Sequence, residues 1–292
     1  MTRIGVIGIG GAWSTERLLD AIERKTGFRC LVDMSRVRLD LPSGEMQHDD
    51  VDLLSLDALV IKKIGAIYST DLLDRLDMLR MLASRGLRIF SNPSEIMRVL
   101  NRLTCTITLQ SCGIPMPPTI ITESVVHAMS GIQEFGDAIL KPLFSTKARG
   151  MQMVSADSVT MSELAAFQKQ NTVMYIQKRV DIPGKDLGVV FLGGQYLTTY
   201  ARVKTHKDTW TTSTAFGGRY EPHEPSAAVV ALAQKSQDAF NLDFTCVDIV
   251  ETGEGPMVFE VSAFGGFRGI AETCNIDAAE RYAAYVLKQI GN

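Results

Sequence analysis

Apolar residues follow two different periods along the first 92 residues. Short continuous apolar runs, which are typical of buried strands, alternate with stretches in which Leu and Ile recur every three or four positions, as in amphipathic helices. The two helical stretches end in Gly27 and Gly86. Strands that alternate with helices predict a parallel, doubly wound sheet. The expected strands cover residues 3–9, 28–34, 56–64 and 87–93, and the expected helices cover 13–27 and 71–86.

After residue 92 the order of the elements changes. One long helix is expected over 94–113, and a stiff, proline-rich connector follows it. We therefore place a domain boundary between Asn92 and Pro118. Beyond it, strands follow one another through short turns, with an apparent hairpin at Gly193–Gly194. The pattern predicts an α/β unit followed by an α+β part with an antiparallel sheet.

A second predicted hairpin, TCVDIVETGEGPMVFEVS over residues 245–262, carries the sharpest chemical signal. If its turn centres on Glu254, the facing pairs follow from the geometry of an antiparallel hairpin. The expected pairs are Val250–Val258, Asp248–Glu260 and Cys246–Ser262. Because side chains alternate between the two faces of a strand, five residues should be buried together. They are Val247, Ile249, Met257, Phe259 and Val261.

Asp248, Glu260 and Ser262 share the opposite face of this hairpin. Two carboxylates directly across a pair of strands repel each other unless a cation lies between them. Carboxylate and hydroxyl oxygens are hard ligands, which suit Mg²⁺ or Mn²⁺ and do not suit zinc. The alternative is a solvated polar face on which water and salt screen the repulsion, and spacing alone leaves it open.

Composition argues against two classes of partner, nucleic acids and membranes. The net charge of −3 argues against a nucleic-acid partner, because nucleic-acid-binding domains are usually strongly basic. The chain has no apolar run long enough to span a membrane, so we expect no membrane association. Its five cysteines are scattered, with no metal-ligand or disulfide-framework spacing, which predicts reduced thiols and a cytoplasmic protein.

Local positive charge gathers in the segment ILKPLFSTKARGM, residues 139–151. Lys141 lies inside an apolar strand, where a cation requires an anionic partner. The loop that follows offers hydroxyls, cations and space for a phosphate to approach backbone N–H groups. It contains Ser145, Thr146, Lys147, Arg149 and Gly150. A solvated loop tip is the alternative for Lys147 and Arg149.

More cations follow at Arg202, Lys204 and Lys207. Cations that favour phosphate, together with a divalent-metal site, are typical of a protein that binds a nucleoside triphosphate with Mg²⁺. The sequence has no GxxxxGK[ST] segment and no protein-kinase signature, so neither of those classes is indicated.

A competing interpretation rests on GIGGAW at the start of the chain. Gly8 and Gly10 match the first two glycines of a dinucleotide fingerprint, and Asp33 ends the next strand near the position of a ribose-binding acid. Trp13 stands where the third glycine is required, which disfavours an NAD-dependent oxidoreductase. A turn, or part of a substrate-binding surface, fits this segment better.

The order of these segments resembles the ATP-grasp superfamily and, within it, the RimK-like carboxylate–amine ligases. The resemblance covers roughly residues 88–290. More narrowly, the whole chain resembles the ATP-grasp member of the bacterial gene set called the GAK system. The segments that carry the resemblance are NRLTCTITLQSCGIPMPPT, AILKPLFSTKARGM, VMYIQKRV, DLGVVFLGGQYLTTYARV, WTTSTAFGG, VDIV and VFEVSAFGGFRGI.

The resemblance implies an ATP-grasp fold in three parts. Residues 1–95 would form a Rossmann-like domain, residues 96–176 a linker helix with a small lid subdomain, and residues 177–292 a C-terminal subdomain with the metal site. ATP would lie between two sheets. Ligases of this type are often dimers or tetramers, so a homo-oligomer is an expectation from the resemblance alone.

The resemblance also assigns roles to individual residues. The phosphate site would consist of Arg102, Lys141, Ser145, Thr146, Lys147, Arg149 and Gly150. Gln177, Lys178 and Val180 would line the adenine pocket, and Asp186 would contact the nucleotide. Arg202 would hold the terminal phosphate or an acyl phosphate. Mg²⁺ (or Mn²⁺) would bind Asp248, Glu260 and, more weakly, Ser262. Arg268 would grip the substrate carboxylate, with a surface or capping arginine as its alternative.

The implied activity is ATP-dependent amide-bond formation through an acyl phosphate. An amino acid such as glutamate would be joined to a carboxylate-bearing acceptor, which is a peptide, a protein or a small cofactor. Among the departures from the family pattern, Ser262 replaces an Asn, and Thr211 and Ser213 stand where Arg and Asn are common. These departures motivate the alternative of a nucleotide-binding regulatory or assembly module without ligase turnover.

Overall fold

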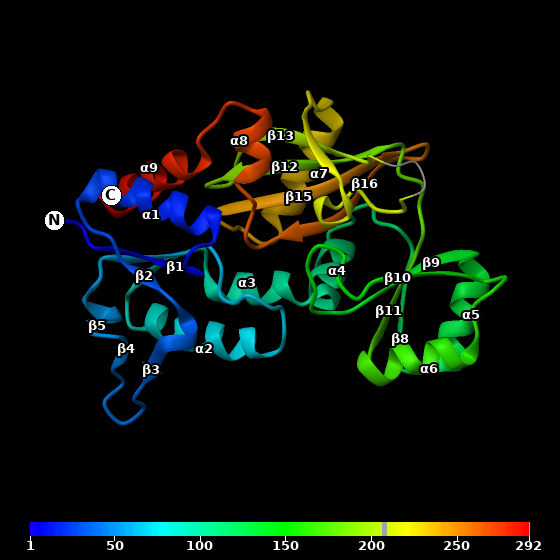
Figure 1. Cartoon of the computed structure of the whole chain (residues 1–292), viewed down its shortest axis with the longest axis horizontal. Coiled ribbons are helices and arrows are strands. Elements are labelled where there is room, and N and C mark those ends of the chain that lie inside the picture. Colours follow the sequence, from blue (N-terminus) through cyan, green and yellow to red (C-terminus); the bar gives the residue numbers. More distant parts are fainter. Residues whose placement is uncertain (206–208, 292) are drawn as a thin grey trace.

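The computed structural model describes residues 1–205 and 209–291, in which helices flank a set of β-sheets (Figure 1). The first sheet is wholly parallel and has the strand order β2-β1-β6-β7. It confirms the parallel α/β unit predicted for the N-terminal part. Its strands are β1 (Ile4–Ile7), β2 (Leu31–Val32), β6 (Ala58–Ile61) and β7 (Arg88–Phe90), connected in part by α1 (Trp13–Thr26) and α2 (Asp71–Ser84).

A small antiparallel sheet between β2 and β6 was not predicted. It has the order β3-β4-β5, with two short 3₁₀ turns beside it. Strands of two or three residues are too short for an alternating pattern to become visible, which explains the omission. The elements are η1 (Met34–Arg36), β3 (Val37–Leu39), β4 (Met46–His48), β5 (Val51–Asp52) and η2 (Leu53–Ser55).

The single helix predicted over 94–113 is wrong, because two helices, α3 (Pro93–Leu100) and α4 (Arg102–Ser111), stand in its place. Asn101 lies between them with extended backbone angles, and its side chain accepts a hydrogen bond from the Thr104 N–H at 3.2 Å. Asn101 therefore ends one helix and caps the next. The predicted domain border at 95/96 falls inside α3.

The middle sheet has the antiparallel order β10-β9-β11-β8. Its own small core includes Ile132, Leu140, Phe167 and Ile176. The sheet continues to Lys178, so the predicted border at 176/177 falls inside a strand. Its elements are β8 (Thr119–Thr122), α5 (Val125–Phe135), β9 (Asp137–Lys141), β10 (Gln152–Ser155), α6 (Met161–Gln170) and β11 (Met174–Lys178).

The C-terminal sheet is antiparallel, in the order β14-β13-β12-β15-β16. The predicted hairpin at Gly193–Gly194 is confirmed, and both glycines have the positive φ that a tight turn requires. The elements of this part are β12 (Lys185–Leu192), β13 (Gln195–Val203), η3 (Thr214–Phe216), β14 (Arg219–Pro222), α7 (Ala227–Asp238), β15 (Phe244–Thr252), β16 (Gly255–Ser262), α8 (Arg268–Thr273) and α9 (Ala278–Ile290).

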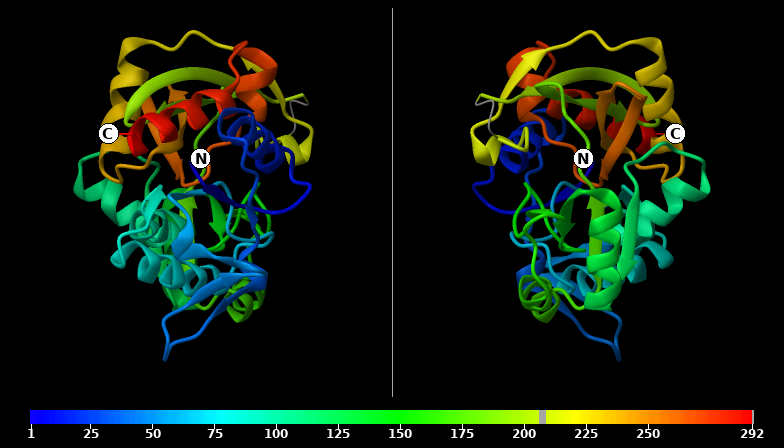
Figure 2. Two further views of the ribbon diagram at one scale, coloured as in Figure 1. Left: turned by 90° about the vertical axis from the view of Figure 1, so that its left-hand side faces the viewer. Right: turned by 90° about the vertical axis from the view of Figure 1, so that its right-hand side faces the viewer.

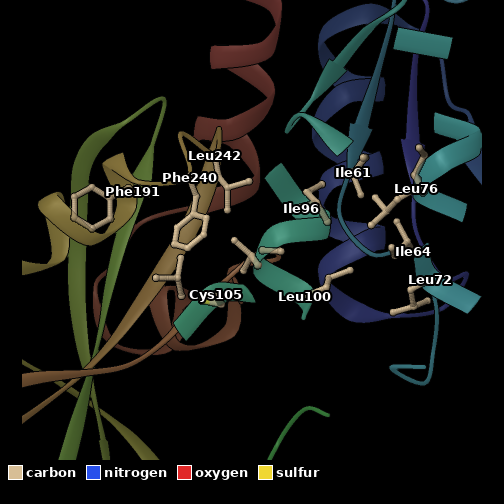
Figure 3. Close-up of a cluster of buried hydrophobic side chains, with 14 of the residues drawn as sticks. Ile61, Ile64, Leu72, Leu76, Ile96, Leu100, Cys105, Phe191, Phe240 and Leu242 are labelled. Carbon is tan, nitrogen blue, oxygen red and sulfur yellow. The ribbon is translucent and has the colours of Figure 1, made fainter. Parts of the chain in front are cut away.

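The N-terminal and C-terminal sheets share a continuous apolar core. Ile96 and Leu100 of α3 lie between Ile61 of the first sheet and Phe240 beyond α7 (Figure 3). A second contact joins α1 to α9, which lie side by side in Figure 2, and Arg17 pairs with Asp277 there at 2.7 Å. These contacts hold the carboxyl end of the N-terminal sheet against the larger sheet.

The β15–β16 hairpin has the predicted register at two of its three predicted pairs. Asp248 lies opposite Glu260, and Cys246 lies opposite Ser262. The third prediction is wrong, because a β-bulge next to Asp248 moves Val250 onto Met257. One extra residue on β16 therefore separates the two halves of the hairpin.

The bulge also changes which side chains are buried. Val247, Ile249 and Val261 lie in the core as predicted. Val258, which the straight register placed on the polar face, is fully buried, whereas Met257 and Phe259 are only half-buried. Phe259 instead lines the cavity described below. The prediction that Met257 and Phe259 belong to the core is therefore wrong.

Val258→Thr should lower the free energy of unfolding by about 1–3 kcal/mol, because a hydroxyl would replace a buried methyl without a partner. Val126→Thr is the matched control, since Val126 is 65% exposed, and should change stability by less than about 0.5 kcal/mol. Urea unfolding measures both. Equal, small effects would mean that Val258 faces solvent and that the bulge is absent.

Candidate active site

A cavity of about 470 Å³ lies among the three larger sheets, which is a size typical of ligand pockets. The end of β6, the helix α4, the loop after β9 and strands β11, β12, β13, β15 and β16 all contribute to its walls. Most of the predicted site residues line it. They are Arg102, Lys141, Ser145, Thr146, Lys147, Gln177, Lys178, Val180, Asp186, Arg202, Asp248, Glu260 and Ser262.

Three predicted residues lie elsewhere. Arg149 and Gly150 belong to the same loop as Lys147 but do not line the cavity. Arg268 begins α8 on the protein surface, 5.5 Å from the Trp13 ring centroid and 4.0 Å from the Glu272 carboxylate. This placement fits the alternative of a surface arginine. Lys207 lies outside the described residues.

One guanidinium is shared by two carboxylates on the floor of the cavity. Arg202 on β13 forms a two-pronged ion pair with Asp186 on β12, at 3.1 and 2.5 Å. Its Nη2 is also 2.9 Å from Asp248 Oδ2 on β15. Arg202 thus spans three adjacent strands. Asp186, predicted to contact nucleotide, is 5% exposed and engaged by this arginine.

Two carboxylates, Asp186 and Asp248, share the single guanidinium of Arg202. Burial raises the pKa of the Asp248 carboxyl above its usual range, nearby Asp186 and Glu260 raise it further, and Arg202 offsets part of the rise. The Asp248 side chain is only 15% exposed. The alternative of a well-solvated polar face therefore does not fit Asp248, and an added cation would favour its ionised form.

The donor set fits Mg²⁺ only in part. Among the described residues, no group of three or more His, Cys, Asp and Glu side chains is placed to hold a metal ion. Asp248 and Glu260 alone supply carboxylates on facing positions of the hairpin. Mg²⁺ characteristically takes one or two carboxylates and completes its shell with water and phosphate oxygens. The pair therefore suits a magnesium ion that arrives with a phosphorylated ligand.

Lys141 projects from the end of β9 and is 8% exposed. Its Nζ donates to Gln177 Oε1 at 2.5 Å and lies 5.7 Å from the Phe259 ring centroid. Burial, and then the neighbouring Arg102, lower the pKa of Lys141 to about 7. No described carboxylate forms an ion pair with Lys141, so an anionic ligand would offset the cost of burying its charge.

Arg102 connects α4, the loop after β9 and β16. Its Nε donates to the Pro142 carbonyl at 3.1 Å, its Nη2 donates to Ser145 Oγ at 3.3 Å, and its Nη1 lies 3.7 Å from Glu260. Its backbone N–H donates to Leu143 O at 3.2 Å. Arg102 therefore fixes the cationic loop beside the hairpin, a role that the sequence did not suggest.

Sequence reasoning missed a contribution from the N-terminal sheet. Lys62 and Lys63 follow β6 directly and line the cavity. Lys62 is 5% exposed, donates to the Gly265 carbonyl and lies 4.0 Å from the Phe267 ring centroid. Burial, and then Lys63, lower its pKa to about 7. The carboxyl end of a parallel strand is a usual place for ligands, so the Lys pair after ALVI could have been noticed.

The dinucleotide interpretation finds no support at Asp33. Its carboxylate accepts hydrogen bonds from the Ser35 N–H at 2.9 Å and the Ser35 hydroxyl at 2.8 Å, and so caps a 3₁₀ turn. Trp13, in the place of the third glycine, is 39% exposed. Ser14, the next residue, lines the cavity, whereas residues 8–13 are not among its lining residues.

Comparison with known proteins shows the same order of parts. The RimK-like ATP-grasp domain family matches residues 99–286. The tetrahydromethanopterin:alpha-L-glutamate ligase of Methanosarcina acetivorans is 24% identical over 314 residues, covering 96% of this chain and 95% of that protein. A probable alpha-L-glutamate ligase of Stenotrophomonas maltophilia is 25% identical over 285 residues, covering 94% of each.

Solved structures agree with this fold over nearly the full length. The RimK domain ATP-grasp protein of Sphaerobacter thermophilus superposes with a TM-score of 0.74 at 19% identity, covering 98% of this chain and 100% of that one. The ATP-grasp ligase PsnB, in complex with its minimal precursor, gives a TM-score of 0.76 at 17% identity and 99% coverage of both chains. The family match spans well over half of the sequence, and the chain belongs to the RimK-like ATP-grasp family.

Proposed function

We propose that the protein is an ATP-dependent carboxylate–amine ligase that forms an amide bond through an acyl phosphate. The observation that carries this proposal is the shared cavity. The opposed carboxylates Asp248 and Glu260 line it together with the cationic loop and the buried Lys141, which has no carboxylate partner among the described residues. Phosphoryl transfer from a nucleoside triphosphate requires a divalent metal ion beside cationic side chains that bind the phosphates.

The relatives support the same activity. Proteins covering nearly the whole chain are named as glutamate ligases, and PsnB has been observed with Mg and ADP in its complex with the minimal precursor. We accordingly infer ATP and Mg²⁺ for this protein. The amino acid would be glutamate or a similar amine, and the acceptor a peptide, a protein or a small cofactor.

The reaction would proceed in two steps within the cavity. A carboxylate oxygen of one substrate attacks the γ-phosphorus of ATP, and the bond to ADP breaks. The substrate amine then attacks the acyl carbon, and inorganic phosphate leaves. No enzyme nucleophile is required, because the phosphoryl group itself activates the carboxylate.

The chain's own residues would position and stabilise charge. Lys141 and the loop Ser145–Lys147 would hold the phosphates, and Arg102 would keep that loop beside Glu260. Arg202 would stabilise charge on the transferring group while it orders Asp186 and Asp248. Asp248 and Glu260, with Ser262 as a weaker ligand, would hold Mg²⁺, which neutralises phosphate charge when bound.

The remaining nucleotide contacts follow from the position of β11. Gln177 binds Lys141, and its Nε2 donates to Thr119 Oγ1 at 3.1 Å and the Tyr175 hydroxyl at 3.2 Å. Its side chain is thus fully engaged, so we propose that Gln177, Lys178 and Val180 contact adenine chiefly through their backbone. Arg149 and Gly150 would approach the phosphates only if the loop closed further.

We also propose a cytoplasmic location. A homo-oligomer is expected from the family resemblance alone. All five cysteines are unpaired in the described structure, as is usual in a reducing compartment. No helix in residues 1–205 and 209–291 is long and apolar enough to cross a membrane.

Asp248→Asn should lower turnover by at least about 100-fold, because metal-ion charge stabilisation contributes several kcal/mol to such reactions. The assay contains Mg-ATP, a panel of carboxylic acids, amino acids and acidic peptides, and hydroxylamine as a small amine that traps an acyl phosphate. ADP release and hydroxamate formation are both measured. Asp157→Asn, at an exposed surface position, is the matched control and should behave as the wild type.

ADP release that is equal in wild type and Asp248→Asn would contradict the metal assignment. Wild-type protein that binds Mg-AMPPNP but forms neither ADP nor hydroxamate with any acid would contradict the ligase proposal. That second result would favour a nucleotide-binding module without turnover.

Nucleotide binding should be coupled to proton uptake by Lys141. With a pKa of about 7 in the free protein, most Lys141 amines are neutral at pH 8, and adjacent phosphates favour the protonated form. The Kd for Mg-AMPPNP should therefore rise between pH 7 and 9, by up to about tenfold per pH unit. Calorimetric titration in buffers with different ionisation enthalpies measures the proton uptake directly.

Lys141→Arg provides the control for this pH dependence. Arginine stays protonated throughout the range, so its variant should show a flatter profile and less proton uptake. An unchanged profile in Lys141→Arg would show that another group takes up the proton.

A further inference from the structure

Lys62 is a buried cation of the cavity that makes none of the proposed nucleotide or metal contacts. It is 5% exposed and lines the cavity directly after β6. The N-terminal sheet fixes its position, because its backbone N–H donates to the Ile7 carbonyl of β1 at 2.9 Å. Its side chain reaches the C-terminal subdomain and donates to the carbonyl of Gly265, which follows β16. The Lys62 ammonium therefore has a defined place between the two parts of the fold.

The aromatic rings around Lys62 place it at the open end of the β15–β16 hairpin. Its Nζ lies 4.0 Å from the ring centroid of Phe267 and 5.4 Å from that of Phe244. Phe244 begins β15, and Asp248 follows it on the same face of that strand. At the usual rise of a β-strand, the Cα atoms of Phe244 and Asp248 are about 13 Å apart. Lys62 thus lies at the end of the hairpin that is farther from the turn.

Lys141 lies on the other side of the carboxylate pair. Its Nζ is 5.7 Å from the ring centroid of Phe259, which directly precedes Glu260 on the side of the hairpin turn. Asp248 and Glu260 face each other, so along the hairpin they lie between Phe259 and Phe244. The cavity therefore has one buried lysine on each side of its proposed metal ligands.

The surroundings of the two lysines differ. On the side of Lys141, Arg102 donates to Ser145 Oγ at 3.3 Å and so attaches the cationic loop, which is the proposed place of the nucleotide phosphates. On the side of Lys62, Gly266 is exposed and lines the cavity. No described side chain or distant backbone atom lies within 4 Å of the position that a Cβ of Gly266 would take. Space for a second reactant is therefore open beside Lys62.

No described group near Lys62 supplies the negative charge that a buried ammonium requires. It forms no ion pair with a described carboxylate, and the charges that act on it come from Lys63 and Cys246. Burial raises the pKa of the Cys246 thiol well above its usual range, so the thiol is uncharged. One carbonyl and two aromatic rings offset only part of the cost of burying the charge. A carboxylate in the open space would complete the set of partners.

We propose that Lys62 binds the carboxylate that receives the phosphoryl group, so that the acid lies between Lys62 and the metal ligands, on the side opposite the nucleotide. The proposal rests on the ligase function above and gives the N-terminal domain a residue that contacts the acid directly. Asp248, Glu260 and the nucleotide phosphates repel an approaching carboxylate, and the charge of Lys62 offsets this repulsion. Lys62 stays protonated while the carboxylate oxygen bonds to the γ-phosphorus and ADP leaves.

Lysine NMR tests the contact without knowledge of the natural acid. Protein labelled with ¹³C at the lysine Cε atoms is loaded with Mg-AMPPNP, and acetate is the probe, with acetamide as its neutral analogue and chloride to keep the ionic strength constant. The Cε chemical shift follows the protonation of each amine. Burial lowers the pKa of Lys62 to about 7, and acetate should raise it by about one unit or more, whereas acetamide should not.

Lys62→Gln identifies the signal by its loss and tests the contact in the reaction. Glutamine keeps a donor for the Gly265 carbonyl and removes the charge. In the ADP-release assay, with the acid of the panel that reacts fastest, the KM for the acid should rise about tenfold or more. The Kd for Mg-AMPPNP should stay within about twofold of wild type. If Lys62→Gln does not fold, Lys62→Arg serves to identify the signal, and the NMR titration of the wild type decides.

Lys169→Gln is the matched control, because Lys169 is an exposed lysine on α6 with no ion-pair partner among the described residues. This variant should keep the wild-type KM and the response of Lys62 to acetate. A lysine that only ties β6 to the segment after β16 would respond equally to acetate and to acetamide. That result, or an acetate response confined to Lys141, would overturn the proposal.

Failure of this contact differs from failure of the ligase function. ADP release with an unchanged KM for the acid in Lys62→Gln, and no response of Lys62 to acetate, would remove the contact and leave the ligase. A response of Lys62 to acetate but not to acetamide, in protein that forms neither ADP nor hydroxamate with any acid, would leave the carboxylate contact and remove the ligase.

Discussion

The guanidinium of Arg202, shared by Asp186 and Asp248, is the interaction on which the site depends. Buried carboxylates on adjacent strands would repel each other, and the sheet tolerates them because one cation pairs with both. Glu260 adds a third carboxylate to the same cavity, 3.7 Å from Arg102 Nη1. The carboxylates of the C-terminal sheet therefore lie beside the cationic loop that follows β9.

The rest of the fold brings these carboxylates and the cationic loop together. Arg102 attaches the cationic loop to α4 and reaches toward Glu260. Helix α3, directly before α4, packs Ile96 and Leu100 between the N-terminal and C-terminal sheets (Figure 3). The same packing holds the end of β6 against the cavity, so Lys62 and Lys63 face it as well. Packing far from the reacting atoms thus determines which charges meet.

Some of this architecture could be predicted from the sequence. A turn centred on Glu254 predicted Asp248 opposite Glu260, but Thr252 pairs with Gly255, so the turn is placed differently and the extra residue of the bulge restores the predicted pair. The bulge was not predictable, since a one-residue shift depends on how Val258 and Phe259 pack. The break at Asn101 was also missed, although asparagine is a known helix cap. Lys62 and Lys63 become significant only when the strand order places the end of β6 beside a distant hairpin.

Binding of Mn²⁺, followed by electron paramagnetic resonance with and without AMPPNP, tests the account most directly. Because Arg202 and Arg102 already lie near the two carboxylates, protein alone should bind Mn²⁺ weakly, and nucleotide phosphates should complete the ion's shell. The fraction of protein-bound Mn²⁺ should correspond to an affinity at least tenfold higher with AMPPNP, and Glu260→Gln should remove that gain. Equal Mn²⁺ binding with and without nucleotide, or a gain that survives in Glu260→Gln, would contradict the assignment of these carboxylates to a metal that binds together with ATP.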